Sequence, residues 1–264
     1  MTKVAPKVAV EKDGTITVVS IDRFAEARNA VDPETAGLLR EAFFAFDKDE
    51  TQSVAILTGR DGTFCAGYDL KVAASRSSRP TFKPDAPGPM GPTRHLLSKP
   101  VIAAVEGYAV AGGLELALWC DLRVASESAK FGVFCRRFGV PLIDLGTIRL
   151  PRLIGHSRAM DLILTGREVR AQEAFDIGLA NRLVPAGEAL NAAVELARQI
   201  ASFPKTCMRN DRLSAIEQWG MEEDAAMRNE FQRGSATMAT GESAAGASDF
   251  AKGAGRHGKS RESS

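Results

Sequence analysis

The sequence predicts an α/β fold, and three observations lead to this prediction. Short apolar runs typical of buried strands alternate with amphipathic stretches typical of helices. Glycine-rich loops follow two of the apolar runs, where folds of this class carry their functional residues. With 264 residues and 44% hydrophobic content, the chain can bury a full core. We expect a core over residues 1–200 and a helical C-terminal region with a flexible tail over residues 201–264.

The first part of the chain is predicted to form a hairpin, a helix and a strand. Two alternating apolar runs flank the turn pair Asp13-Gly14, a pattern typical of a β-hairpin. Asp32 precedes Pro33, which indicates a helix with an aspartate N-cap and a proline at its first position. The wholly apolar residues 54–57 then predict a buried strand that ends in the first glycine-rich loop.

The second glycine-rich loop is the most informative feature. Residues 101–105 predict a buried strand, and Gly112-Gly113 opens a predicted helix that carries Glu115 among apolar neighbours. Free N–H groups at a helix start attract developing negative charge, and an acid in apolar surroundings can carry a proton near neutral pH. The alternative is a glycine pair that only serves packing and a glutamate that reaches water.

Further strands and helices are predicted along the second half of the chain. The same periodicities indicate strands at residues 122–125 and 179–184. Helices are indicated at residues 149–166, 171–177 and 188–203. This alternation extends the α/β pattern to the end of the predicted core.

Three other segments carry weaker signals. Residues 210–231 are helical in pattern, and their methionines, such as Met221 and Met227, suggest core packing or a subunit contact. Residues 234–264 are rich in Gly, Ala and Ser, which predicts a partly flexible tail. Residues 76–94 hold five prolines and predict a mobile loop that either covers a site or lies inert on the surface.

Composition and spacing argue against several classes of protein. The 34 basic and 33 acidic side chains leave a formal charge of +1 without a basic tract, so no nucleic-acid partner is expected. Charged residues interrupt the most apolar region before it reaches the roughly 20 residues of a membrane span, and no signal peptide is present, so we expect a cytoplasmic protein without a membrane contact. The three histidines and four cysteines show no metal-ligand spacing and no C-x-x-C pair, which predicts free thiols and no bound metal.

Three segments come close to known catalytic motifs, but none of them completes its motif in the right structural context. Residues 62–67 and 107–112 each read G-x-x-x-x-G but lack the Lys and Ser/Thr that complete a P-loop, which argues against a nucleotide hydrolase. Residues 155–159 approximate a G-x-S-x-G elbow, yet Ser157 opens a predicted helix and suits an N-cap better than a nucleophile. What remains is two loops rich in N–H groups and one acid, a set suited to polarising a carbonyl and moving a proton beside it.

Residues 64–71 read Phe-Cys-Ala-Gly-Tyr-Asp-Leu-Lys, and together with residues 99–117 they resemble the enoyl-CoA hydratase/isomerase (crotonase) superfamily. The likeness continues through residues 121–127, 146–155, 164–167 and 178–184. It implies an α/β fold with a crotonase-like ββα spiral core, a helical C-terminal trimerisation region, and assembly into a homotrimer or hexamer. It also implies an acyl-CoA thioester substrate and no separate cofactor, because coenzyme A is part of that substrate.

The resemblance implies roles for individual residues. The thioester oxygen would lie between the backbone N–H groups of Tyr68 and Gly112. The loop 66–70 would line the pantetheine, and Arg28 and Ala30 would lie in the stretch that borders the adenine and the pantetheine. The implied contacts with acyl-CoA are therefore Arg28, Ala30, Ala66, Gly67, Tyr68, Asp69, Leu70 and Gly112.

The resemblance also indicates which carboxylates carry the chemistry. Glu115 matches the glutamate that positions and activates water in the hydratases of the family. Cys135 stands where these hydratases have a second glutamate, and a thiol is a poor general acid. Asp144 lies in a region that supplies carboxylates in other branches, and it could take that role or cap the helix that follows. Cys135 itself is interpreted as a packing residue, with a nucleophilic or redox role as the alternative.

Together these residues predict an enzyme that adds water to a 2-enoyl-CoA thioester. Glu115 and Asp144 would be its catalytic carboxylates, and Tyr68 and Gly112 its oxyanion-hole donors. One alternative is double-bond isomerisation or other enolate chemistry, which needs only one well-placed acid. Another is a catalytically weak acyl-CoA-binding protein, which the absence of the second glutamate would explain.

Overall fold

The computed structural model describes residues 6–75 and 83–255. The chain divides into two compact units, Met1–Ile200 and Ala201–Ser264. The predicted loop at residues 76–94 forms turns and bends from residue 83 onward. The remainder of that prediction, residues 76–82, and the last part of the predicted tail, residues 256–264, lie outside the described residues.

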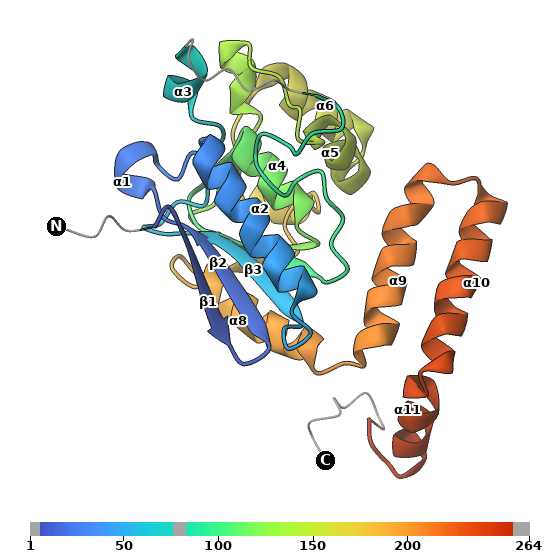
Figure 1. Ribbon diagram of the computed structural model, residues 1–264. Coiled ribbons are helices and arrows are strands. Elements are labelled where there is room, and N and C mark those ends of the chain that lie inside the picture. The colour runs from blue at the N-terminus through green and yellow to red at the C-terminus, as the bar shows by residue number, and fades with distance from the viewer. Residues whose placement is uncertain (1–5, 76–82, 256–264) are drawn as a thin grey trace. The chain divides into compact units, whose positions relative to one another are not determined.

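A six-stranded sheet lies at the centre of the first unit (Figure 1). Its strands follow the order β1-β2-β3-β4-β6-β9, with β1 and β2 antiparallel and every other neighbouring pair parallel. The central strands β3 and β4 are buried almost throughout, as their continuous apolar runs predict. The six strands are β1 (Val8–Asp13), β2 (Ile16–Ile21), β3 (Val54–Gly59), β4 (Val101–Val105), β6 (Leu122–Ser126) and β9 (Arg182–Val184).

A smaller sheet has three strands in the order β5-β7-β8. These strands are β5 (Tyr108–Val110), β7 (Lys130–Gly132) and β8 (Val169–Arg170). β5 pairs parallel with β7, and β7 pairs antiparallel with β8. Because β5 leads directly into helix α4 (Gly112–Trp119), the small sheet fixes the position of the second glycine-rich turn.

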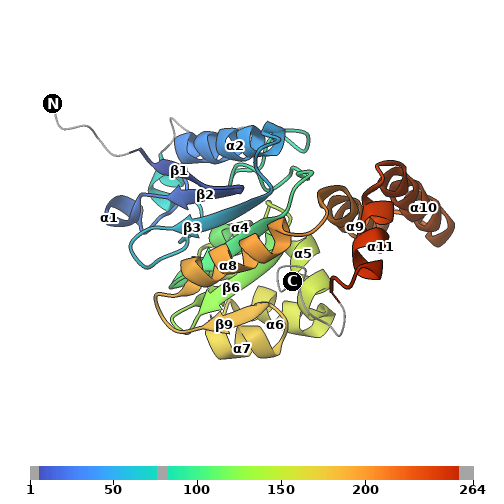
Figure 2. The ribbon, with the colours of Figure 1, turned by 90° about the horizontal axis from the view of Figure 1, so that it is seen from below.

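Helices cover the sheets of the first unit (Figure 2). The first long one, α2, packs against β1 and β2 and buries Leu39 and Phe43 completely. It begins as predicted, with Pro33 at its first position and the Asp32 side chain accepting a hydrogen bond from the N–H of Thr35 at 2.8 Å. The other helices are α1 (Phe24–Ala27), α3 (Leu70–Ala74), α5 (Gly146–Ile154), α6 (His156–Thr165), α7 (Ala171–Asp176) and α8 (Ala189–Ala201), and α2 itself is Pro33–Lys48.

The prediction of one continuous helix over residues 149–166 is wrong. Residues 149–166 form the two helices α5 and α6, which are separated at Gly155. Gly155 has a φ of +83°, a backbone conformation that glycine adopts readily and that ends the regular helical hydrogen bonding. The predicted hairpin and the strands at residues 54–57, 101–105 and 122–125 are confirmed.

The second unit is helical, but its elements differ from the prediction. It contains α9 (Lys205–Glu217), a 3-10 turn η3 (Gln218–Gly220), α10 (Glu223–Ala239) and α11 (Glu242–Ala251), so residues 210–231 span two helices that pack on each other. The predicted flexible tail is wrong up to residue 251. The Glu242 carboxylate accepts hydrogen bonds from the N–H groups of Thr206 and Cys207, both at 3.0 Å. This contact ties the start of α11 to the start of α9, and composition alone does not reveal it.

Candidate active site

The two glycine-rich loops meet in the structure. Cys65 in the first loop pairs with Ala109 in a parallel bridge. A Cβ at Gly67 would lie 2.9 Å from the Cβ of Ala111 and 3.1 Å from the backbone nitrogen of Gly112. Gly67 also has a φ of +101°, which residues with a side chain rarely adopt. The close approach of the loops therefore depends on glycine at position 67.

Two backbone N–H groups remain without partners where the loops meet. The N–H of Val31 donates to the carbonyl of Gly67, and the N–H of Asp69 donates to the carbonyl of Val31, which leaves the N–H of Tyr68 unbonded between them. Gly112 is the first residue of α4, where an N–H has no partner inside the helix. Neither N–H donates a hydrogen bond to another described residue, and both residues line the same cavity.

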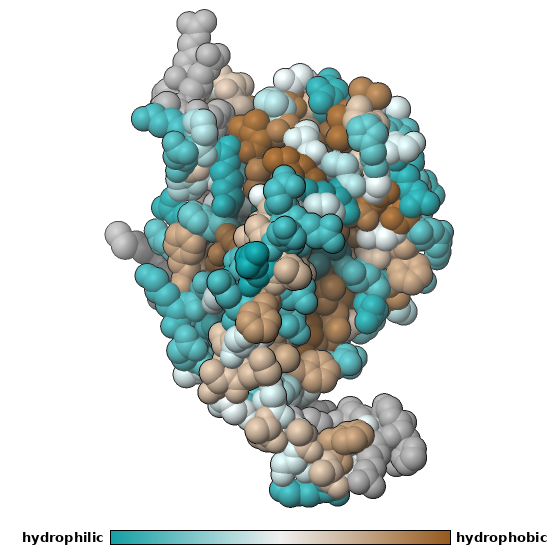
Figure 3. Space-filling model, turned by 90° about the vertical axis from the view of Figure 1, so that its right-hand side faces the viewer, coloured by the Kyte–Doolittle hydropathy of each residue, from teal (hydrophilic) through white to brown (hydrophobic). Residues whose placement is uncertain are grey.

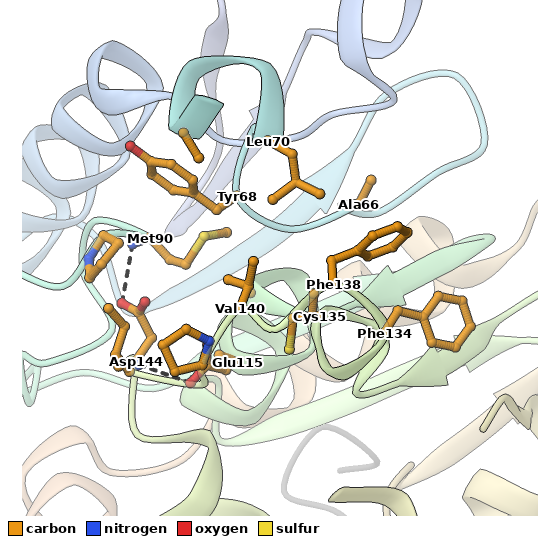
Figure 4. A pocket seen from close by; sticks show the side chains of 16 residues that line it. Ala66, Tyr68, Leu70, Met90, Glu115, Phe134, Cys135, Phe138, Val140 and Asp144 are labelled. Atoms are coloured by element: carbon orange, nitrogen blue, oxygen red, sulfur yellow. Dashed lines mark hydrogen bonds between the residues drawn. The ribbon is translucent and has the colours of Figure 1, made fainter. Parts of the chain in front are cut away.

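This cavity has a volume of about 530 Å³ (Figure 4). Most of its wall is apolar, and the described side chains with a titratable group in it are Glu115, Asp144, Tyr68 and Cys135. Cys135 comes from the 3-10 helix η2 (Phe134–Phe138). The full lining is Ala66, Tyr68, Leu70, Ala73, Pro89, Met90, Ala111, Gly112, Glu115, Phe134, Cys135, Phe138, Val140, Pro141, Ile143 and Asp144.

The structure brings most of the predicted site residues to this cavity and leaves four outside its wall. Gly67 and Asp69 alternate with wall residues of the same loop, and Asp69 instead caps α3. Ala30 is buried away from the wall and Arg28 is exposed. Arg28 still supports the loop, because its carbonyl accepts the N–H of Ala66 at 3.3 Å. The predicted residues on the wall are Ala66, Tyr68, Leu70, Gly112, Glu115 and Asp144.

Glu115 is held by backbone N–H groups rather than by water. Its side chain is only 2% exposed, so the alternative in which it reaches bulk solvent is wrong. Its Oε1 accepts hydrogen bonds from the N–H of Asp144 at 2.8 Å and the N–H of Gly146 at 2.9 Å, while Oε2 has no hydrogen-bond partner among the described residues. Burial, and then the negative charge of Asp144, raise the pKa of Glu115 to about 7. The group can therefore gain or lose a proton near neutral pH.

Asp144 is the second buried carboxylate of the cavity. Its Oδ1 accepts hydrogen bonds from the N–H of Met90 at 3.1 Å and from the hydroxyl of Thr93. The interpretation of Asp144 as a helix cap is wrong, since the N-cap of α5 is Leu145 and no side chain caps it. Burial raises the pKa of Asp144 above its ordinary value, and the hydrogen bond from Thr93 opposes this rise. Figure 4 shows Met90, Asp144 and Glu115 on neighbouring parts of the wall.

Sequence reasoning missed the residues that hold Asp144 in place. Arg149 on α5 donates to the carbonyls of Asp144 at 3.2 Å and Thr93 at 2.7 Å. Arg94 donates to the carbonyl of Ile143 at 2.8 Å and to carbonyls of its own proline-rich loop. The prolines marked this loop as a candidate cover for a site, but no motif indicated which of its residues would contact the acid.

In residues 6–75 and 83–255, no group of three or more His, Cys, Asp or Glu side chains is arranged to hold a metal ion. Over the same ranges, no helix combines the length and apolar composition needed to cross a bilayer. The four cysteines are free, as their spacing predicts.

We expect Gly67→Ala to destabilise the protein more than Gly62→Ala does. Both glycines have a positive φ, so both substitutions should cost about 1–2 kcal/mol of unfolding free energy from backbone strain. Gly62 has open space around its Cβ position, whereas the Cβ at Gly67 would press on the second loop, which adds about 1–3 kcal/mol. Urea unfolding of both variants measures the difference, and equal losses would contradict the tight contact between the loops.

Comparisons with known proteins identify the family. The sequence pattern described as enoyl-CoA hydratase/isomerase matches residues 11–254. The chain is 39% identical over 236 residues to enoyl-CoA hydratase EchA19 of Mycobacterium tuberculosis, with 87% of each chain covered, and 40% identical over 191 residues to carnitinyl-CoA dehydratase of Proteus mirabilis, with 72% of each covered. The crystal structure of enoyl-CoA hydratase EchA1 from Mycobacterium marinum matches with a TM-score of 0.87 and 35% identity, covering 94% of this chain and 96% of that one. The chain therefore belongs to the enoyl-CoA hydratase/isomerase family and has the crotonase fold that its sequence predicts.

Proposed function

We propose that this protein adds water to the double bond of a 2-enoyl-CoA thioester. The observation that carries the proposal is the arrangement of Glu115, which is buried, bonded through one carboxylate oxygen, and located in the same cavity as two unpaired N–H groups. Enoyl-CoA hydratases and carnitinyl-CoA dehydratases are among its relatives, and their names describe addition and removal of water at acyl-CoA thioesters.

In this proposal the N–H groups of Tyr68 and Gly112 bind the thioester oxygen. They donate to it more strongly as it becomes an enolate oxygen, and each such donor contributes roughly a hundred- to a thousandfold in rate. The loop 66–70 lines the pantetheine arm of the substrate, which makes a separate cofactor unnecessary. Arg28 and Ala30, outside the cavity wall, remain proposed contacts for the distal part of coenzyme A.

The two carboxylates divide the proton transfers between them. Glu115, whose Oε2 faces no protein donor, accepts a proton from the attacking water, and the hydroxyl group bonds to the β-carbon. Asp144, whose Oδ1 is fixed by Met90 and Thr93, delivers a proton to the α-carbon of the enolate. In this assignment, Asp144 takes the role of the second glutamate from another part of the cavity wall, because Cys135 occupies the position of that glutamate.

The second candidate function is double-bond isomerisation, and the cysteine at position 135 favours it. With a thiol there, Glu115 alone could remove a proton from one carbon and return it to another, as a single acid/base suffices for that reaction. A catalytically weak acyl-CoA-binding protein is the remaining alternative. Activity assays separate all three.

We expect Glu115→Gln to lower the turnover of crotonyl-CoA hydration by about 100- to 10,000-fold, the range typical for loss of a general acid/base. The amide keeps the shape of the side chain but cannot accept a proton from water. Loss of absorbance of the enoyl thioester measures the rate. The matched control is Glu127→Gln, an exposed residue outside the cavity, which should keep full activity. A wild type that binds acyl-CoA but neither hydrates it nor isomerises a 3-enoyl-CoA would refute the proposal.

The pH dependence distinguishes hydration from isomerisation. Hydration by two carboxylates needs one proton shared between Glu115 and Asp144. Glu115, with a pKa of about 7, holds the last proton that the pair loses. The kcat/KM of hydration should therefore fall as the pH rises through 7. Isomerisation with Glu115 as the base needs its ionised form and should rise over the same range.

Substitution of Asp144 is expected to shift the pKa of Glu115. Asp144→Asn removes a negative charge that raises the pKa of Glu115, so the titration of Glu115 followed by carbon NMR should move to lower pH. Asp224→Asn, in the first turn of α10, should leave it in place.

We also propose that the protein assembles through its helical unit, as a homotrimer or hexamer, in the cytoplasm. Large apolar side chains of this unit are exposed, including Met227 at 59% and Phe231 at 71%, and Figure 3 shows brown-tinted apolar side chains at the surface of the C-terminal helices. The four free cysteines support a reducing compartment.

Sedimentation velocity tests the assembly. A double substitution of Met227 and Phe231 by Glu should lower the sedimenting mass to that of one chain, because it places charges within the apolar surface. Glu230→Gln, on the same helix, is the matched control and should leave the assembly intact. A wild type that sediments as a single chain would rule the proposal out.

A further inference from the structure

The cavity contains a nucleophile that the proposed hydration does not use. Cys135 lies on η2, is 7% exposed, and lines the same wall as Glu115 (Figure 4). Cys65 and Cys120 are buried outside the cavity lining, and Cys207 is exposed on α9. Of the four cysteines, only Cys135 therefore lies where an acyl-CoA bound in this cavity could reach it.

A second observation makes the thiol part of a reactive site. The Glu115 side chain is 98% removed from solvent, yet its Oε2 has no hydrogen-bond partner among the described residues, so this oxygen is available to a group inside the cavity. The charge of Glu115 also acts on the thiol, since burial first and that charge second raise the pKa of Cys135. The Glu115 carboxylate, a proton acceptor, is thus close enough to the protonated Cys135 thiol for its charge to affect that thiol.

We propose that Cys135 adds to the β-carbon of a 2-enoyl-CoA thioester and forms a covalent thioether with it, in competition with water. This inference rests on the proposed binding of enoyl thioesters with their carbonyl at Tyr68 and Gly112. The chemical class recognised is an α,β-unsaturated thioester, whose β-carbon is electrophilic, and a saturated acyl-CoA does not qualify.

The step balances without any further reactant. The thiol proton passes to Oε2 of Glu115, and the sulfur forms a bond to the β-carbon. The electron pair of the carbon–carbon double bond moves toward the thioester oxygen, which the N–H groups of Tyr68 and Gly112 stabilise. The proton then passes from Glu115 to the α-carbon, which restores the carboxylate. The product contains the intact acyl-CoA, and reversal of the same steps releases it.

The surroundings explain why this thiol would react selectively. Burial keeps Cys135 protonated and therefore weakly nucleophilic toward general alkylating reagents. It becomes a thiolate when Glu115 accepts its proton beside a bound enoyl group. The exposed Cys207 also has an acid beside it, since its thiol donates to Oδ2 of Asp211 at 3.9 Å, but it does not line the cavity with the N–H groups of Tyr68 and Gly112, so a neighbouring acid alone does not give it this reactivity. The adduct would occupy part of the cavity, and accumulated substrate would thereby slow its own hydration.

Mass spectrometry of the intact protein after incubation with crotonyl-CoA and acid quenching tests the proposal. We expect the mass to increase by one intact crotonyl-CoA, with peptide mapping to Cys135, and no increase with butyryl-CoA. Glu115→Gln should lower the yield at least tenfold, while Cys207→Ser should leave it unchanged. Wild-type yield should rise with pH through about 7, as Glu115 ionises.

The hydration rate is measured on the same samples, so the two proposals fail separately. An adduct on Cys135 without hydration would overturn the proposed function and keep this inference. Absence of the adduct in the wild type, or an adduct on Cys207 instead, overturns the inference whether or not hydration occurs. A yield that Glu115→Gln does not reduce overturns the role given to Glu115.

Discussion

The hydrogen bonds that the backbone of residues 144 and 146 donates to Glu115 are the constraint on which the rest of the site depends. A buried carboxylate without partners is strongly unfavourable, and these two N–H groups stabilise its charged form while burial opposes it. Burial and then the charge of Asp144 outweigh these N–H groups and leave a pKa of about 7, which suits proton exchange at neutral pH. A Cβ at Gly146 would lie 2.8 Å from Cγ and Oε1 of Glu115, so glycine is needed where α5 begins.

Helix α4 carries both halves of the site in its first turn. Gly112 provides an unpaired N–H, and Glu115, three residues later, provides the acid. This turn lies close against the first loop, since a Cβ at Gly113 would lie 2.1 Å from the carbonyl oxygen of Cys65, so the approach requires glycine there. One tight backbone contact therefore positions the N–H groups of both loops and the acid together. The close backbone approaches at Gly67 and Gly113 therefore set where the N–H groups and the acid lie.

Local patterns were sufficient for much of the fold and for the centre of the site. The continuous apolar run before Gly112, and Glu115 set among apolar residues, predicted a buried strand and a buried acid, because both features are encoded within one short segment. The rest depended on contacts between distant segments. From the sequence, Asp144 fits a helix cap equally well, since nothing near it in sequence reveals Met90 and Thr93 as its partners. The order of α11 depends in the same way on Glu242 meeting the start of α9.

The electrostatics of the two carboxylates bear on the direction of catalysis. Burial, and then the charge of Asp144, raise the pKa of Glu115 to about 7, while the hydrogen bonds from Thr93 and Met90 oppose the rise at Asp144, so the form with a single proton favours the proton on Glu115. In the mechanism proposed above, that distribution suits removal of water, in which Asp144 would take the α-proton and Glu115 would protonate the departing hydroxyl group. Addition of water starts from the opposite distribution, with the proton on Asp144, and ends in the favoured one. The two forms differ only in which carboxylate holds the proton. In the proposed reaction, the proton distribution therefore affects how readily each direction starts, whereas the concentrations of the thioesters decide the net direction.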